Sequence, residues 1–118
     1  MAVKDVVGRY VEDVALRMLE RAGWEVLARN WRCRFGELDI VARDGAEAVF
    51  VEVKTRRSDA FGGAVAAVTP NKVRRLRMLA GEWLAAQETV FAGVRIDVVA
   101  VTIPRAGAPA IEHLRGVG

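Results

Sequence analysis

The chain has one cysteine, one histidine and no apolar run long enough to cross a membrane. Cys33 has no second cysteine with which to form an internal disulfide, and the start of the chain carries no basic-plus-apolar signal segment. We therefore expect a reduced, cytoplasmic protein without a membrane partner. Because the only histidine, His113, lies in the tail with no evident partner, we interpret Cys33 as incidental rather than catalytic.

Lysine is scarce as well, because 15 of the 18 basic residues are arginine, and the net charge is only +3. A guanidinium group is a planar donor suited to phosphate oxygens. Clusters of arginines are typical of nucleic-acid-binding surfaces. GC-rich codon usage alone also favours arginine, so an ordinary solvated surface could have the same composition. The clusters are Arg29, Arg32 and Arg34; Arg56 and Arg57; and Arg74, Arg75 and Arg77.

Length and composition predict one domain over residues 1–118, since 53% of the residues are apolar and can form a core. Apolar periodicity and turn residues predict the order of the helices and strands. The predicted order of helix, three strands, helix and strand indicates an α/β fold in which helices flank a mixed central sheet. The expected segments are helix 5–22, strands 24–31, 37–43 and 48–54, a mobile loop 55–69, helix 70–87, strand 94–103 and a short edge strand 111–114. Gly23 is the expected stop of the first helix, and Thr69 is the expected N-cap of the second.

The second and third predicted strands form a hairpin that carries the candidate chemistry. A two-residue loop at Asp44 and Gly45 would place Asp39 opposite Phe50, and a four-residue loop from Asp44 to Glu47 would place it opposite Glu52. Either register puts Asp39, Glu52 and Lys54 on one face, because side chains alternate along a strand. The opposite face is then apolar and comprises Leu38, Ile40, Ala42, Val49, Val51 and Val53.

Two acids that face each other across strands repel, so Asp39 and Glu52 should raise each other's pKa unless a cation lies between them. Mg²⁺ and Mn²⁺ bind carboxylates and keep other positions for water and phosphate. Lys54 beside such an ion could orient the attacking water or stabilise charge on the phosphate. A glutamate and a lysine on a solvent-facing strand is the common alternative. By periodicity alone Glu12, at the edge of the first helix's apolar stripe, could face solvent or point at the sheet as another ligand, and the surface interpretation is favoured.

Several blocks of sequence, in order, carry a resemblance that covers nearly the whole chain. They are Gly8 and Arg9 with Glu12 and Ala15, residues 28–30 with Arg32, residues 36–42, residues 49–56, Phe61 and Gly62, residues 67–70 with Lys72, Arg75 and Leu76, and residues 95–101. In these blocks the chain resembles the YraN-like family of small bacterial proteins. That family belongs to the PD-(D/E)XK nuclease superfamily and is considered related to archaeal Holliday-junction resolvases.

The resemblance implies a restriction-endonuclease-like core of helix, three strands, helix and strand, and it implies roles for individual residues. Asp39, Glu52 and the backbone carbonyl of Val53 would bind Mg²⁺ or Mn²⁺, and Lys54 would be the catalytic lysine. Glu12 would be a helix-borne acid that completes the catalytic site, contrary to the interpretation from periodicity. Contacts to nucleic acid are assigned to Arg32, Arg34, Arg56, Arg57, Lys72 and Arg75.

The function implied is a divalent-metal-dependent nuclease, an enzyme that hydrolyses DNA phosphodiester bonds, with DNA or RNA and branched or linear substrates left open. The resolvase relatives imply a homodimer, since a branched junction needs two symmetric cuts. Two other functions stay open: a non-catalytic module that binds nucleic acid or a partner on a nuclease fold, and an interaction protein whose acidic face is solvated. Asp97 is expected to have only a structural or supporting role.

Overall fold

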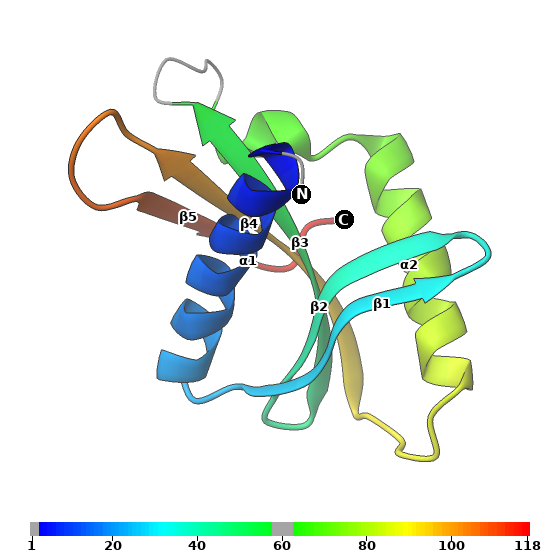
Figure 1. Ribbon diagram of the computed structural model, residues 1–118. Helices are drawn as coiled ribbons and strands as arrows, with labels where there is room; N and C mark the ends of the chain where they lie inside the picture. The colour runs from blue at the N-terminus through cyan, green and yellow to red at the C-terminus, as the bar shows by residue number, and fades with distance from the viewer. Residues whose placement is uncertain (1–2, 58–62) are drawn as a thin grey trace.

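A computed structural model describes residues 3–57 and 63–118 (Figure 1). β3 extends to Arg57 rather than to residue 54, and the segment predicted as a mobile loop contains a short 3₁₀ helix, η1 (Ala64–Ala67). Residues 58–62 of that predicted loop lie outside the described residues. The other elements follow the predicted order: α1 Val3–Arg21, β1 Glu25–Cys33, β2 Gly36–Asp44, β3 Glu47–Arg57, α2 Pro70–Ala85, β4 Gly93–Ile103 and β5 Ala110–Leu114.

The strands form one mixed sheet in the order β1-β2-β3-β4-β5. Neighbouring strands are antiparallel except β3 and β4, which are parallel and are connected through α2. The two helices cover opposite faces of the sheet, which is the arrangement of a restriction-endonuclease-like α/β core and confirms the predicted fold class. In the part of the chain that the structure describes, no helix is long and apolar enough to span a membrane.

Local sequence signals fix the end of α1 and the start of α2. Gly23 has a φ of +87° after the end of α1, and the Trp24 N–H bonds back to the last turn of the helix at 3.1 Å. Thr69 caps α2, because its hydroxyl accepts a hydrogen bond from the Lys72 N–H at 3.2 Å. Both the glycine stop and the threonine cap were predicted from the sequence, and both are confirmed.

Both faces of the sheet are buried, so the prediction of one apolar face and one acidic face is wrong. A crossover helix between parallel strands must cover a sheet face, and α2 does so on the side that was predicted to be acidic. Val41 and Phe50, which share that face by alternation with Asp39 and Glu52, are buried there with residues of α2. The core on the α2 side comprises Leu38, Val41, Ala48, Phe50, Leu76, Leu79, Ala80, Trp83 and Ile96, and that on the α1 side Val11, Ala15, Leu19, Trp24, Ile40, Ala42, Val49, Val51, Val99 and Val101.

β2 separates from β3 where the acids lie. The pairing of β2 with β3 ends at Ile40 and Val51, whereas the pairing of β2 with β1 continues to Gly36 at the tip of the hairpin. The β1–β2 hairpin therefore extends away from the rest of the sheet toward α2 (Figure 1). Leu38 packs on the α2 side and Ile40 on the α1 side, so the strand twists between them. Continuing the register by one pair sets Asp39 across from Glu52, as in the second of the two predicted registers. The loop differs from both predictions, because Asp44 pairs with Glu47 and only Gly45 and Ala46 connect the strands.

Candidate metal centre and nucleic-acid interface

Asp39 fills the opening between β2 and β3. The Val53 N–H donates to Asp39 Oδ2 at 2.9 Å, in place of the strand carbonyl that β2 no longer offers. A hydrogen bond also joins the carboxyl groups of Asp39 and Glu52. The two acids predicted as metal ligands thus meet where the strands separate. The role of the Val53 carbonyl as a further ligand stays a prediction, since the contact seen here involves only the N–H of that residue.

Glu12 of α1 and Glu37, which is on the same strand as Asp39, both approach Asp39 and form with it and Glu52 an acidic cluster. One carboxylate oxygen from each of Glu12, Glu37 and Asp39 lies within 4.8 Å of the other two. The Glu12 side chain is only 19% exposed, so its interpretation as a surface residue is wrong. Arg29 of β1 lies 3.6 Å from Glu12 and so helps to hold it toward the sheet. The alternation along the strand places Glu37 on the same face as Asp39, but no role in the site was predicted for it from the sequence.

Burial and the neighbouring acids together raise the pKa of Asp39. Burial is the largest cause that raises the pKa of Asp39, the charge of Glu52 is the next, and the result is a pKa of about 8 despite the opposing hydrogen bond from Val53. The nearby charge of Glu12 acts in the same direction as that of Glu52. Without a cation, Asp39 is therefore largely protonated at neutral pH. A divalent cation would offset the charges of Glu52 and Glu12, which together with burial favour the protonated form.

Lys72 supplies a positive charge beside the acids. Its Nζ lies 3.1 Å from Glu52 Oε2. Lys72 sits in the first turn of α2, where the helix dipole disfavours a cation, and no acidic residue in that turn compensates. The ion pair with Glu52 offsets this local cost. The structure thus places a residue predicted to contact nucleic acid against a predicted metal ligand.

The other predicted residues of β3 lie beyond the acids. Lys54 follows Glu52 by two positions and is exposed, and no ion pair of Lys54 with the acids is seen within residues 3–57 and 63–118. Arg56 and Arg57 end β3, where they pair in register with β4. The structure therefore brings Glu12, Asp39 and Glu52 together and places Lys54, Arg56 and Arg57 progressively farther along the strand.

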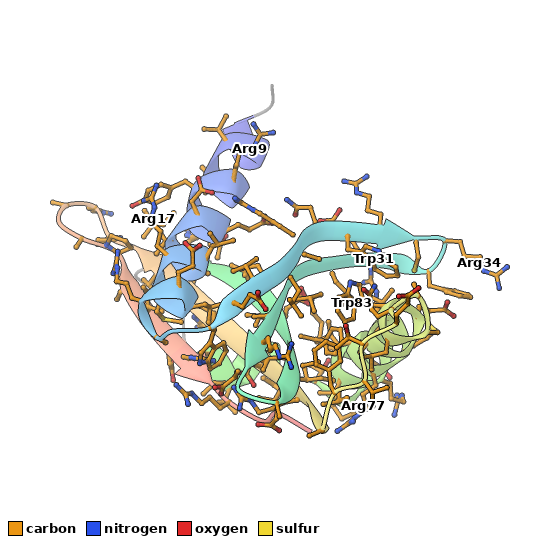
Figure 2. All side chains as sticks on the ribbon, turned by 90° about the horizontal axis from the view of Figure 1, so that it is seen from below. Arg9, Arg17, Trp31, Arg34, Arg77 and Trp83 are labelled. Carbon is orange, nitrogen blue, oxygen red and sulfur yellow. The ribbon has the colours of Figure 1, made fainter. Side chains whose placement is uncertain are left out.

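A basic hollow lies at the tip of the β1–β2 hairpin. It has a volume of about 400 Å³ and brings together three predicted nucleic-acid contacts, Arg32, Arg34 and Arg75. Arg34 projects from the hairpin tip, away from the labelled arginines of α1 (Figure 2). Arg32 Nε donates to Glu37 Oε2 at 2.5 Å, so the hollow adjoins the acidic cluster. Its lining residues are Arg32, Cys33, Arg34, Phe35, Gly36, Glu37 and Arg75.

A separate polar network surrounds Asp97 of β4, which is fully buried. Its carboxylate accepts hydrogen bonds from Arg95 at 2.9 Å and from the Gly116 N–H at 3.0 Å, and lies 2.8 Å from His113 Nε2. Burial raises the pKa of Asp97, but the hydrogen bonds to His113, Arg95 and Gly116 outweigh it and lower the pKa below its usual value. His113 thus has a partner that sequence reasoning missed, and the network ties β5 and the following turn to β4.

The acidic cluster suits a hard divalent cation. Its donors are carboxylate oxygens, the ligand type that Mg²⁺ and Mn²⁺ prefer, and neither histidine nor cysteine belongs to it. Burial is the largest cause of the raised pKa of Asp39, and the charges of Glu52 and Glu12 raise it further, so a bound cation would relieve a repulsion among these carboxylates. The residues present therefore fit the metal ion that the sequence predicted.

Known proteins match this chain over most of its length. A model described as "Uncharacterised protein family UPF0102" matches residues 11–101, which include the acidic cluster and α2. A "UPF0102 protein" from Beutenbergia cavernae is 60% identical over 118 residues, covering 100% of both chains. Similar proteins from Kineococcus radiotolerans and Mycolicibacterium vanbaalenii are 58% and 57% identical over 115 and 111 residues, covering 97% and 94% of this chain and 94% and 92% of theirs.

Proposed function

Because the chain belongs to the uncharacterised protein family UPF0102, the YraN-like family that its motifs resemble, we propose its function from the site itself: a divalent-metal-dependent nuclease that hydrolyses DNA phosphodiester bonds. The convergence of Glu12, Asp39 and Glu52 at the opening between β2 and β3 carries the proposal. Gathering half-buried like charges is unfavourable unless a cation or a proton compensates. A fold that only solvated these acids would have no need to bring them together.

The chain supplies the groups that phosphodiester hydrolysis needs. Asp39 and Glu52 would hold the metal ion, with Glu12 and Glu37 beside them. A bound Mg²⁺ or Mn²⁺ supplies an activated water and neutralises charge on the phosphate. The Lys54 ammonium would stabilise negative charge that develops on the phosphate. The arginines at the hairpin tip and at the end of β3 would bind neighbouring phosphates of the strand.

One observation favours a second candidate function. The ion pair between Lys72 and Glu52 already gives one of the acids a cationic partner without a metal. A lysine that permanently replaced the metal would make this a non-catalytic module that binds nucleic acid. The two candidates differ in one measurable property, which is whether bound DNA is cut when a divalent ion is added.

Cleavage of end-labelled DNA tests the proposal. The substrates are a four-way junction, a flap, a single strand and a plain duplex, each with Mg²⁺ or Mn²⁺. Wild type is expected to cut at least one of them, and Asp39→Asn and Lys54→Ala are each expected to lose about 100-fold or more in rate. Glu20→Gln, an exposed acid on α1, is the matched control and should cut like wild type. Paired symmetric cuts in the junction would reveal the homodimer that the resolvase resemblance implies.

DNA binding by wild type without cleavage under either metal ion would favour the non-catalytic module. Cleavage that survives in Asp39→Asn would show that the acidic cluster is not the catalytic centre.

A further inference from the structure

Phe35 occupies an unusual place at the turn of the β1–β2 hairpin. Arg34 and Phe35 form the two-residue connection between Cys33 and Gly36, which pair with each other. Such turns favour glycine, asparagine and aspartate, so the turn geometry gives no reason for an aromatic residue. The Phe35 side chain is 38% exposed and is not part of either core. The Arg34 guanidinium carbon lies 4.6 Å from the centre of its ring, which is a cation–π contact.

Arg75 of α2 reaches the same turn. Its guanidinium lies so close to Gly36 that a Cβ atom at that position would be 2.8 Å from Arg75 Nη2. Gly36 also has a φ of +144°, a conformation that glycine adopts readily and other residues rarely do. The glycine therefore lets a guanidinium group approach the hairpin tip. Among the residues that the structure describes, no carboxylate pairs with Arg75.

The hollow made by these residues opens next to the acidic cluster. Glu37 lines the hollow and also lies within 4.8 Å of the Asp39 and Glu12 carboxylates. The volume of about 400 Å³ falls within the range of roughly 300–1,000 Å³ that is typical of small-ligand sites. A strand whose phosphate reaches the acids could therefore place a neighbouring nucleotide in the hollow.

We infer that the hairpin tip is a binding subsite for one unpaired nucleotide, whose base stacks on Phe35 and whose phosphates contact Arg34 and Arg75. This inference rests on the proposed nuclease function and names its substrate class: DNA with an unpaired nucleotide beside the bond that is cut. Aromatic rings bind the faces of bases, and those faces are covered in an intact duplex. The three arginines of the hollow complement the phosphate charge.

Fluorescence anisotropy with labelled oligonucleotides in EDTA tests the inference, because binding is then measured without cleavage. A single strand, a forked duplex and a blunt duplex of the same sequence are compared. Phe35→Ala is expected to weaken binding of the single strand and the fork about 5- to 100-fold and to change duplex binding less than about twofold. Phe35→Trp keeps an aromatic face and should bind like wild type. Arg75→Ala should weaken binding of all three and lower the dependence on salt.

Tyr10→Ala is the matched control, because Tyr10 is an exposed aromatic residue on α1, away from the hairpin tip. It should leave binding of all three oligonucleotides unchanged. Equal affinity of wild type and Phe35→Ala for the fork, or an equal loss on fork and blunt duplex, would overturn the inference. So would a wild-type protein that binds none of the oligonucleotides.

The cleavage assay distinguishes a failure of the nucleotide subsite from a failure of the proposed nuclease function. Metal-dependent cutting by wild type that Phe35→Ala leaves unchanged on every substrate would overturn the subsite and keep the nuclease. Fork binding that depends on Phe35, in a protein that cuts nothing, would keep the subsite and overturn the nuclease.

Discussion

Lys72 of α2 reaches across to Glu52 of β3, with its Nζ 3.1 Å from Glu52 Oε2. A metal ion bound by Glu52 would compete with this ammonium group for the same carboxylate. Lys72→Met keeps an unbranched side chain but removes the charge, so it is expected to raise the affinity for Mn²⁺ about 3- to 10-fold. Electron paramagnetic resonance of free Mn²⁺ measures this affinity. Lys72→Arg should retain the wild-type value, and equal affinities of wild type and Lys72→Met would contradict the competition.

The metal-free protein is expected to lose stability as the pH rises from about 4 to about 8. Burial, with the charge of Glu52, raises the pKa of Asp39 from 3.8 to about 8 in the folded state. Between these values the folded protein holds a proton that the unfolded chain has released, so a rise in pH favours unfolding. Asp39→Asn should flatten this slope and increase the free energy of unfolding near pH 8 by an amount on the order of 2 kcal/mol.

Urea unfolding in EDTA at several pH values checks this prediction for Asp39. Glu20→Gln removes an exposed acid of α1 and should keep the wild-type slope. An Asp39→Asn protein whose stability still falls with pH as steeply as that of wild type would refute the assignment.

The ionisation of Asp97 is predicted to make stability depend on pH in the direction opposite to that of Asp39. Although burial raises its pKa, hydrogen bonds to His113, Arg95 and Gly116 lower it overall, so its stabilising effect is present above about pH 4 and is lost as the pH falls further. Asp97→Ala leaves Arg95 and His113 without their shared partner and should cost about 3–5 kcal/mol in the free energy of unfolding at neutral pH. Urea unfolding measures this loss.

Glu88→Ala, which removes an exposed acid after α2, should change stability little and is the control for Asp97→Ala. If Asp97 has only a structural role, a folded Asp97→Asn protein should bind Mn²⁺ as tightly as wild type. A loss of metal affinity in Asp97→Asn would indicate that the Asp97 network supports the acidic cluster.

Gly36→Ala is expected to harm both the fold and the binding of nucleic acid. The φ of +144° strains any residue with a Cβ atom, and that atom would collide with Arg75. The free energy of unfolding should fall by about 1–3 kcal/mol, and the affinity for a forked duplex should fall because Arg75 is displaced. Gly8→Ala in α1 meets no atom within 4 Å and should instead stabilise the protein by up to about 1 kcal/mol. Equal stabilities of the two variants would contradict this account of Gly36.

The sequence predicted the parts of the site that depend on local periodicity. Alternation along β2 and β3 restricts which residues share a face, and loop length leaves only two even registers, so Asp39 and Glu52 could be placed together before the structure was known. The cap at Thr69 likewise follows from a side chain that bonds within its own helix turn. Both predictions depend on residues close together in the chain.

The missed features depend on residues far apart in the chain. Periodicity alone missed Glu12, which the family resemblance did assign to the site: it turns toward the sheet beside Arg29 of β1, a contact that the pattern of α1 does not contain. His113 meets Asp97 only because β5 pairs with β4. β2 separates from β3 where the β1–β2 hairpin extends toward α2, and the Val53 N–H then bonds to Asp39. The alternation of apolar and polar residues does not predict this separation.

The central claim is that the acids at the opening between β2 and β3 share a divalent ion. Anomalous diffraction from crystals of the wild-type protein soaked in Mn²⁺ tests it most directly. The account predicts a manganese peak with carboxylate oxygens of Asp39 and Glu52 within about 2.5 Å, and with Lys72 turned away from Glu52. A cluster without a manganese peak, in which Lys72 still contacts Glu52 at a saturating Mn²⁺ concentration, would contradict the account.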